Sequence, residues 1–244
     1  MQGRRDDTGR FFLDDLRRIG VKTNPHAVDT PGKSGRCLVL ITPDAERSMS
    51  TFLGISGDLG AAEMNTKALA ASRYLYIEGF LASSPSATEA ALACREIAAR
   101  NDVATTMTLS DASMVAHFRT SLMKMLGNGV DHLFCNEEEA LDWAHTDRLD
   151  IAANELKDIA KSVNITIGAR GSLVVNGRQH REVGGFSVRP LDTNGAGDIY
   201  AGACMYGWCQ GMPAEEAARF GNFAASRLIT RYGARCRRPP ITSP

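Results

Sequence analysis

One short segment, Asp192–Asp198 (DTNGAGD), carries the residues best suited to chemistry in this sequence. Gly195 and Gly197 leave backbone N–H groups uncovered by side chains, and the Ala-rich stretch that follows predicts a helix that starts there. Partial positive charge collects at a helix N-terminus and favours a phosphate oxygen. Asp198 lies just inside this turn, where a carboxylate can accept a proton from a hydroxyl that faces the same phosphate.

A carboxylate base beside an anion hole is the minimum set for moving a phosphoryl group onto an alcohol. The same segment has a plainer interpretation, in which the glycines make a tight turn and Asp198 caps the helix. The spacing of these residues alone gives the two interpretations equal weight.

The wider sequence resembles the PfkB carbohydrate kinase family, which has the ribokinase-like fold. DTNGAGD followed by YAGA resembles the C-terminal signature of that family. Further resemblances occur in the family's order, at Asn136–Glu139 (NEEE), Thr166–Gly171 (TIGARG), Gly221–Ala225 and Gly233-Ala234. The likeness runs from about Asp6 to Ala234, which is nearly the whole chain.

The resemblance implies a role for each matching residue. Asp198 resembles the catalytic base, and the anion hole for the transferring phosphate is implied at Gly195, Ala196 and Gly197. Outer-shell magnesium residues are implied at Asn136 and Glu139, and ATP contacts at Thr166, Gly168, Gly171, Asn194 and Asn222. The implied cofactors are ATP and Mg²⁺. Some family members also bind a monovalent cation at positions that correspond to Asp192 and Gly233-Ala234.

The acceptor is predicted from softer similarities. The segments TPDAERSMSTFLGIS, YLYIEGF and TLSD look most like the lid and first core strands of bacterial adenosine kinase-like members. We therefore predict ATP-dependent phosphorylation of a hydroxymethyl group, with the 5′-hydroxyl of adenosine as the acceptor. Two alternatives stay open, namely a sugar kinase of the ribokinase or fructokinase type and a truncated, non-catalytic nucleotide-binding relative.

Family members usually carry a further N-terminal segment with an acidic substrate residue and a Gly-Gly element. Asp6–Gly9 (DDTG) resembles the short motif that follows that segment. We therefore expect the sheet of this chain to lack its first strands.

Strand and helix patterns alternate from about Arg73 onward, which predicts an α/β fold with a mostly parallel sheet. With the resemblance, the prediction becomes a ribokinase-like three-layer sandwich with a small β lid. Residues 1–20 and 56–244 are predicted to form the nucleotide-binding kinase domain, and residues 21–55 a β-hairpin lid. The strands are expected at 74–80, 103–109, 131–136, 164–168, in a hairpin turning at Asn176-Gly177, and from Phe186. The helices are expected at 9–20, 86–100 with a Ser86–Glu89 capping box, after Ser110-Asp111, at 137–144, near 150–161, after Asp198, and from Pro213 at its N1 position.

Composition excludes several classes of protein. The chain has 244 residues, and its 28 Lys and Arg balance its 28 Asp and Glu, which argues against a nucleic-acid coat or a polybasic membrane surface. No run approaches the roughly 18 apolar residues of a spanning helix, and the N-terminus has no apolar signal core. The six cysteines include no CxxC pair, which favours reduced thiols. We expect a cytoplasmic protein with a small-molecule substrate, without nucleic-acid or membrane partners, and with a lid through which two copies could pair.

Overall fold

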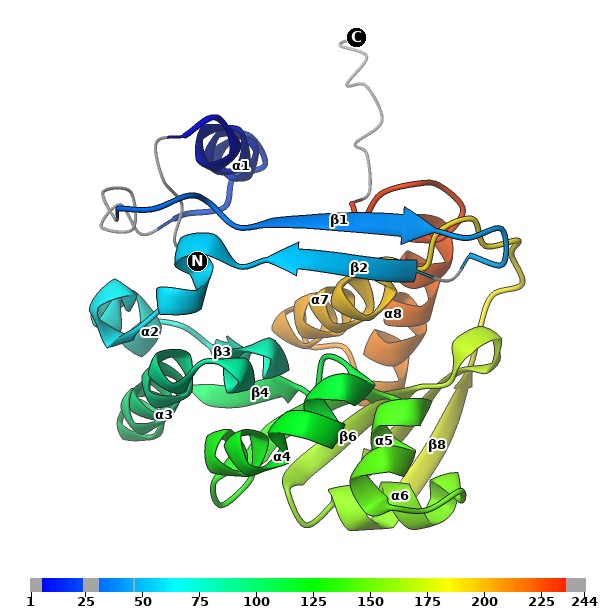
Figure 1. Ribbon diagram of the computed structural model, residues 1–244. Coiled ribbons are helices and arrows are strands. Elements are labelled where there is room, and N and C mark those ends of the chain that lie inside the picture. The colour runs from blue at the N-terminus through cyan, green and yellow to red at the C-terminus, as the bar shows by residue number, and fades with distance from the viewer. Residues whose placement is uncertain (1–5, 24–30, 46, 236–244) are drawn as a thin grey trace, which may run out of the picture. The chain divides into compact units, whose positions relative to one another are not determined.

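The structure is a computed structural model, shown in Figure 1, that describes residues 6–23, 31–45 and 47–235. The chain divides into two compact units. Unit 1 comprises Met1–Val39 and Met49–Leu133, and unit 2 comprises Leu40–Ser48 and Phe134–Pro244. The predicted lid, 21–55, contributes to both units and includes residues 24–30, which lie outside the described ranges. Its definition as a domain stays a prediction.

Helices and strands alternate through most of the described chain. The helices are α1 (Asp7–Arg18), α2 (Thr66–Ala70), α3 (Pro85–Arg100), α4 (Ala112–Leu126), α5 (Glu137–Ala144), α6 (Leu149–Leu156), α7 (Ala196–Cys209) and α8 (Ala214–Leu228). The strands are β1 (Arg36–Ile41), β2 (Arg47–Phe52), β3 (Tyr74–Ile77), β4 (Ala104–Thr108), β5 (Val130–Asn136), β6 (Ala160–Thr166), β7 (Gly171–Asn176) and β8 (Gln179–Gly184). Short 3₁₀ turns are η2 (Gly54–Asp58), η3 (Ala61–Glu63), η4 (Gly79–Ser83) and η5 (Gly168–Arg170).

Two sheets result, which confirms the predicted α/β class. Six strands form a mixed, mostly parallel sheet in the order β3-β4-β5-β6-β7-β8, and β1 and β2 form a small antiparallel sheet. β3 pairs with β4 in parallel, whereas β6, β7 and β8 form an antiparallel meander. The predicted turn at Asn176-Gly177 is confirmed, since Asn176 pairs with Gln179 and Gly177 has φ +56°.

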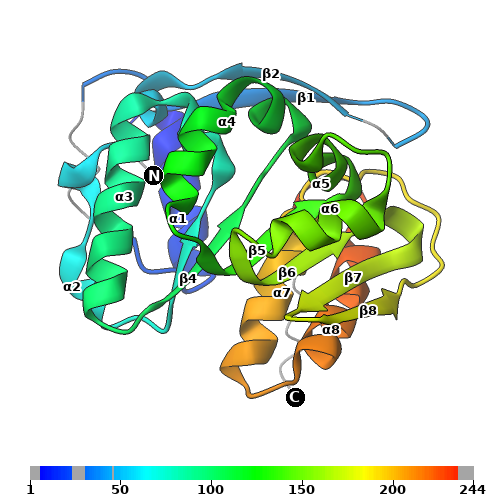
Figure 2. The ribbon, with the colours of Figure 1, turned by 90° about the horizontal axis from the view of Figure 1, so that it is seen from below.

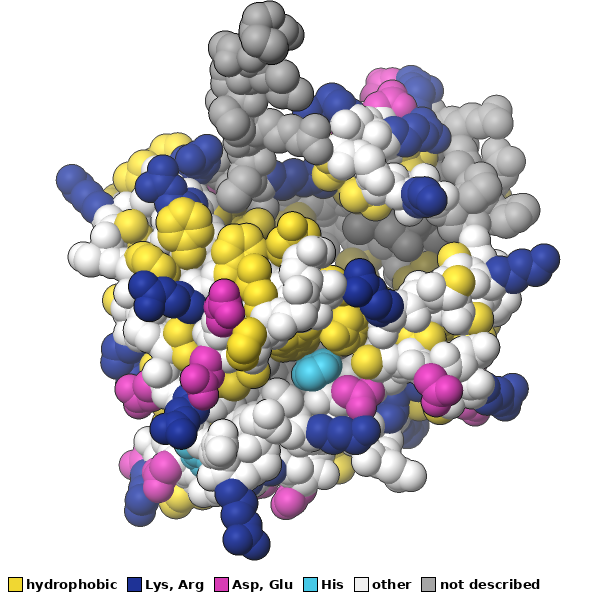
Figure 3. All heavy atoms as spheres, turned by 180° about the vertical axis from the view of Figure 1, so that it is seen from behind, with side chains coloured by type: hydrophobic (Ala, Val, Ile, Leu, Met, Phe, Trp, Pro, Cys, Tyr) yellow, Lys and Arg dark blue, Asp and Glu magenta, His cyan; other side chains and the backbone are white. Residues whose placement is uncertain are grey.

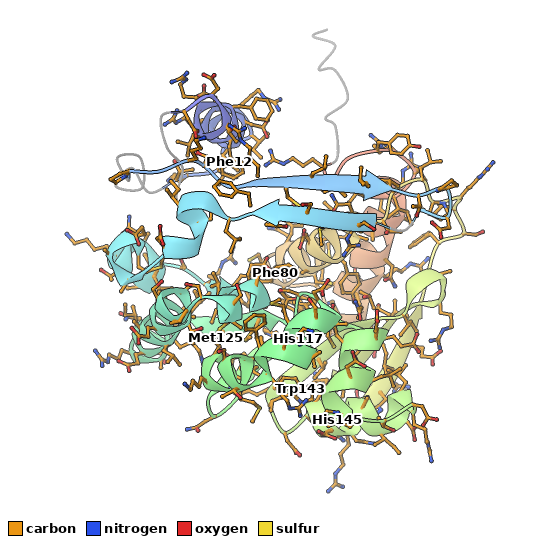
Figure 4. All side chains as sticks on the ribbon, viewed as in Figure 1. Phe12, Phe80, His117, Met125, Trp143 and His145 are labelled. Carbon is orange, nitrogen blue, oxygen red and sulfur yellow. The ribbon has the colours of Figure 1, made fainter. Side chains whose placement is uncertain are left out.

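In unit 1, helix α3 begins with a cap that the sequence prediction misplaced. Ser84 is the N-cap residue, its hydroxyl accepts from the Ala87 amide at 3.4 Å, and Pro85 follows at the first helical position. The predicted Ser86–Glu89 capping box is therefore wrong. Proline is favoured at the first helical position because the amide hydrogen that it lacks would have no intrahelical partner there, so the helix starts at Pro85 with Ser84 as its cap. The buried face of α3 is rich in alanine and lies beside α4 (Figure 2), whose Met125 is fully buried (Figure 4).

Helix α1 of unit 1 is anchored by Asp6. The Asp6 carboxylate accepts hydrogen bonds from the Gly9 amide at 2.8 Å and from the Ser34 amide at 3.0 Å. These bonds, the Ser34 amide first, lower the pKa of Asp6 from 3.8 to about 2. The carboxylate thereby ties the first turn of α1 to the segment that leads into β1.

Unit 2 places helices α7 and α8 side by side and carries the β6-β7-β8 meander (Figure 2). Its core includes Val163, Ile165 and Val175 from the meander and Trp143 from α5, which is 2% exposed (Figure 4). Strand β7 is buried continuously from Gly171 to Val175, whereas no residue of β8 at the sheet edge is fully buried.

Other predicted boundaries need correction. The strand expected at 74–80 ends at Ile77, because Gly79 turns so close to the next strand that a Cβ there would lie 2.5 Å from the Leu109 carbonyl oxygen. The helix expected near 150–161 ends at Leu156, and Ala160 already starts β6. Pro213 is the N-cap of α8 rather than its first helical residue.

The segment from Phe186 is not a strand. Residues 185–190 have no regular secondary structure, and the amides of Leu191 and Asp192 both donate to the Ile229 carbonyl oxygen, at 2.7 and 3.3 Å. The segment before α7 is therefore hydrogen-bonded to the end of helix α8 and not to a neighbouring strand, as the prediction of a strand requires.

The described cysteines are free, as predicted. Cys94, Cys135 and Cys204 are buried, Cys209 is partly exposed, Cys37 on β1 is exposed, and Cys236 lies outside the described ranges. Burial raises the pKa of Cys94, raises that of Cys135 well above its usual range, and raises that of Cys204 to about 12. Among the described residues, no helix is long and apolar enough to span a membrane.

Candidate functional site

The N-terminus of α7 presents the predicted glycine turn. Gly195 has φ +78°, a left-handed conformation, and α7 starts at Ala196. The Ala196 amide donates to Thr193 O at 3.1 Å, whereas the next amides, of Gly197 and Asp198, belong to the helical turn that lacks intrahelical acceptors. A Cβ at Gly197 would meet no atom within 4 Å, so the space on the Cβ side of this residue is open.

Asp198 lies in the first turn of α7 with its side chain exposed. Its carboxylate therefore belongs to the same helix end as the Gly197 and Asp198 amides, which lack intrahelical acceptors. The simpler capping interpretation does not fit this residue, because Gly195 occupies the N-cap position and no side chain caps α7.

Buried Asp192 stabilises the glycine turn before α7 through two hydrogen bonds. It is 4% exposed, and its two carboxylate oxygens accept from the Asn194 and Gly233 amides, both at 2.8 Å. A Cβ at Gly195 would come within 2.9 Å of Ala234 Cβ, so the loop after α8 packs directly against the turn. The family resemblance implies a monovalent cation near Asp192 and Gly233-Ala234. In the structure the Asp192 carboxylate accepts hydrogen bonds from two backbone amides at this position.

The tip of the β1-β2 hairpin also contacts this turn within unit 2. Thr193 Oγ1 donates to the Ala45 carbonyl oxygen at 3.0 Å, and Ala45 is 2% exposed with φ +68°. The loop 191–195 is therefore held on two sides, by the hairpin tip and by the segment that follows α8.

Asn136 and Glu139 form a reciprocal capping box at the start of α5. The Glu139 amide donates to Asn136 Oδ1 at 2.8 Å, and Asn136 donates in return through N to Glu139 Oε2 at 3.2 Å and through Nδ2 to Glu139 Oε1 at 2.7 Å. Glu139 is 4% exposed. Both residues thus have a structural role, whatever further role they have toward a metal ion.

The predicted nucleotide loop lies between β6 and β7. Thr166 ends β6, and its hydroxyl is 3.5 Å from the Cys135 carbonyl oxygen of the neighbouring strand β5. Gly168 has φ +62° with open space around it, whereas Gly171 has φ +104° and its Cβ position lies 2.2 Å from the Val183 carbonyl oxygen. Gly171 is therefore required by the close approach of β8.

Asn222 of α8 reaches the same strand end. It is 7% exposed, and its Nδ2 donates to the carbonyl oxygens of Val183 at 2.9 Å and Gly184 at 3.4 Å. Arg170 in turn bonds Glu137 at the start of α5. Of the predicted residues, Gly171 and Asn222 thus both lie against the end of β8, and the Arg170–Glu137 pair joins the loop to the start of α5.

Sequence reasoning missed a polar cluster in unit 1. Glu78 follows β3, and Ser110 follows β4 with φ +74°. Ser110 Oγ accepts from the Gly79 amide at 2.8 Å and donates to Glu78 Oε2 at 3.2 Å. Ligands of parallel sheets bind beyond the carboxyl ends of the strands, so a carboxylate directly after a short strand was the available signal.

An aromatic pair beside Asn222 was also missed. Phe223 is 46% exposed and meets Phe186 edge to face with ring centroids 5.5 Å apart. Figure 3 shows hydrophobic side chains exposed in a group on the rear face of the molecule. The sequence pair Asn222-Phe223 is only a weak signal of a binding site, because an aromatic residue next to an amide residue on a helix usually packs in a core.

The residues present suit magnesium bound mainly through a nucleotide. No cluster of three metal-ligating side chains exists within 6–23, 31–45 and 47–235. Mg²⁺ usually keeps several waters and binds through substrate phosphates with one or two carboxylates, so Glu139 with Asn136 would suffice as the protein's oxygen donors.

The sequence pattern of the pfkB family carbohydrate kinases matches residues 5–239. The chain belongs to this family. The predicted recognition is thereby confirmed, and the family acts on small molecules.

Two solved structures resemble this pfkB family member over almost its whole length. The adenosine kinase from Sinorhizobium meliloti is 32% identical with a TM-score of 0.91, and the match covers 99% of this chain and 73% of that one. A probable sugar kinase from Rhizobium etli CFN 42 is 33% identical with a TM-score of 0.90, and the match covers 99% of this chain and 73% of that one.

A candidate ribokinase II from E. coli, crystallised with ATP and Mg²⁺, is 20% identical with a TM-score of 0.83 over 95% of this chain and 76% of that one. At this identity the likeness shows the fold alone. It confirms the ribokinase-like fold that the sequence predicted.

Proposed function

We propose that this protein is an ATP-dependent kinase that phosphorylates a hydroxymethyl group. The observation that carries the proposal is the N-terminus of α7, where exposed Asp198 follows Gly197, whose amide lies in the first helical turn without an intrahelical acceptor. Membership of the pfkB family and the ATP and Mg²⁺ held by the E. coli relative support it.

Each residue of the turn has a defined task in this proposal. The Gly195–Gly197 turn binds the oxygens of the phosphoryl group, chiefly through the Gly197 amide, where the α7 dipole adds positive potential. Asp198 accepts the proton of the attacking hydroxyl. Phosphoryl transfer depends mainly on positioning and charge stabilisation, which a rigid loop held by Asp192 and Thr193 supplies.

In this proposal the nucleotide is bound by residues of the loop between β6 and β7, of α8 and of the turn before α7. Thr166, Gly168 and Gly171 with Asn222 form the ATP side, and Asn194 joins them from the α7 turn. Bound Mg²⁺ would neutralise polyphosphate charge, and Asn136 and Glu139 would hold its water shell.

Adenosine is the acceptor that we favour, because the Sinorhizobium meliloti neighbour is an adenosine kinase and matches almost the whole chain. A sugar acceptor is the second candidate, supported by the Rhizobium etli neighbour at nearly the same identity.

An acceptor-dependent ADP-release assay tests the proposal. With Mg-ATP, adenosine should stimulate ADP release well above ribose and fructose. Asp198→Asn should lower kcat by about 10²- to 10⁴-fold, the usual contribution of a general base, while the Kd for Mg-ATP is kept. Asp150→Asn is a matched control, because Asp150 also lies in the first turn of a helix but on α6.

The outcomes separate the candidates. Stimulation by a sugar alone would select the sugar kinase. Retained ATP binding with no acceptor-dependent turnover would select the non-catalytic alternative. An Asp198→Asn variant with the turnover of the unmodified chain would remove Asp198 from the base role.

A further inference from the structure

Tyr200 occupies the buried side of α7, two residues beyond Asp198. Its side chain is 1% exposed, whereas Asp198 is exposed. Two residues of an α-helix turn the side-chain direction by about 200°. Tyr200 and Asp198 therefore point to nearly opposite sides of the first helical turn, and whatever holds the ring of Tyr200 also sets the direction of the Asp198 carboxylate.

Three elements of unit 2 hold that ring. The Tyr200 hydroxyl donates to Asn164 Oδ1 of β6 at 3.3 Å, and Phe134 of β5 meets the ring edge to face at a centroid distance of 6.0 Å. Gly221 of α8 lies against the ring, since a Cβ there would be 2.7 Å from Tyr200 Cδ2. The ring thus fits a slot lined by β5, β6 and α8.

The buried polar groups around the Tyr200 hydroxyl lower the stability of the fold, so stability does not account for them. Asn164 is 1% exposed, and within the described part of the chain its Nδ2 has no hydrogen-bond partner. Buried polar groups without partners cost free energy, and phenylalanine would fill the ring volume without a hydroxyl. Burial also raises the pKa of the Tyr200 phenol well above its usual range, so the hydroxyl keeps its proton and acts as a donor.

We propose that Tyr200 is a positioning residue for phosphoryl transfer, whose hydrogen bond to Asn164 fixes the first turn of α7 and thereby the aim of Asp198. The inference rests on the proposed kinase function. Directional bonds resist a small rotation of the helix end, whereas apolar packing alone tolerates it. The Ile199 amide, which donates to Gly195 O at 3.0 Å, belongs to the turn that this bond fixes.

The test compares Tyr200→Phe with Asn164→Leu and with the double variant. A small displacement of a reacting group costs rate rather than binding, so each single variant should lower kcat about tenfold and leave both KM values within about twofold. The double variant should lose no more than the more impaired single variant, because both remove the same bond. Tyr206→Phe is the matched control, since Tyr206 lies on the same helix but is 56% exposed.

Amide hydrogen exchange supplies a readout that is independent of turnover. Peptides that contain Ile199 should exchange faster in Tyr200→Phe than in the unmodified chain, and no faster in Tyr206→Phe. If Tyr200→Phe fails to fold, the same two measurements on Asn164→Leu decide the matter.

Several results would overturn the inference. One is a kcat within twofold of the unmodified chain together with unchanged exchange, and another is a double variant whose losses multiply. If the unmodified chain shows no acceptor-dependent turnover, the proposed function fails and the catalytic role of Tyr200 fails with it. Unchanged exchange in Tyr200→Phe would then refute the tether to Asn164 as well.

Discussion

Two glycines of the loop between β6 and β7 make a matched pair of substitutions, Gly171→Ala and Gly168→Ala. Both residues have positive φ, +104° and +62°. They differ in surroundings, because a Cβ at Gly171 would lie 2.2 Å from Val183 O and 2.5 Å from the Gly185 amide nitrogen, whereas a Cβ at Gly168 would meet nothing within 4 Å.

The expected losses of stability follow from these contacts. Gly168→Ala requires only the left-handed backbone, which costs an alanine about 1 kcal/mol. Gly171→Ala requires a conformation nearly restricted to glycine, with φ +104° and ψ −118°, at about 1–3 kcal/mol. Displacing the end of β8 adds about 1–3 kcal/mol, so the sum is about 2–6 kcal/mol.

Thermal unfolding measures the difference. In a domain of this size 1 kcal/mol shifts the Tm by about 2–4 °C, so Gly168→Ala should lower the Tm by about 2–4 °C and Gly171→Ala by at least about twice as much. Mg-ATP titration then separates stability from binding. Gly168→Ala should raise the Kd for Mg-ATP with little loss of stability, because the added methyl group fills the open space of the proposed ATP loop. Equal Tm losses in the two variants would refute the packing argument, and an unchanged Kd in Gly168→Ala would remove Gly168 from the ATP site.

Two further predictions concern carboxylates of unit 1. Asp6→Ala should destabilise the fold at neutral pH, and this destabilisation should shrink as the pH falls from 3.8 toward about 2, because a lowered pKa stabilises the fold only while the group is ionised. Urea unfolding of both chains at pH 6 and pH 3 checks this, and a pH-independent difference would contradict it. Ligands of parallel sheets bind beyond the carboxyl ends of the strands, so we expect Glu78, directly after β3, to accept a hydrogen bond from an acceptor hydroxyl; Glu78→Gln should then raise the KM of the acceptor about tenfold and leave that of ATP unchanged. Initial-rate kinetics with each substrate varied in turn measure this, and a rise in the KM of ATP alone would place Glu78 elsewhere.

Local patterns sufficed to predict most of the elements. Asn176-Gly177 has the residues of a two-residue hairpin turn, so neighbouring positions determine it. The glycine turn before Asp198 is predictable for the same reason, because Gly195 supplies the left-handed residue that starts α7.

Features that depend on distant residues were not predictable. The segment from Phe186 reads as a strand, yet its continuation is held by the Ile229 carbonyl oxygen at the end of α8. Asp192 looks like a ligand in the sequence, and only the fold brings the Gly233 amide to it. Likewise, nothing near Glu78 in the sequence shows that Ser110 bonds it from 32 residues away.

The contrast among the cysteines offers an experimental handle. Cys94, Cys135 and Cys204 are buried with raised pKa values, so at neutral pH they stay as thiols out of reach of alkylating reagents. Cys37 is exposed on β1, within 3.3 Å of Thr51 on the opposite strand. With Cys209 and Cys236 replaced by serine, a maleimide dye or spin label would attach to the hairpin alone, and its spectrum would report how that hairpin responds to nucleotide and acceptor.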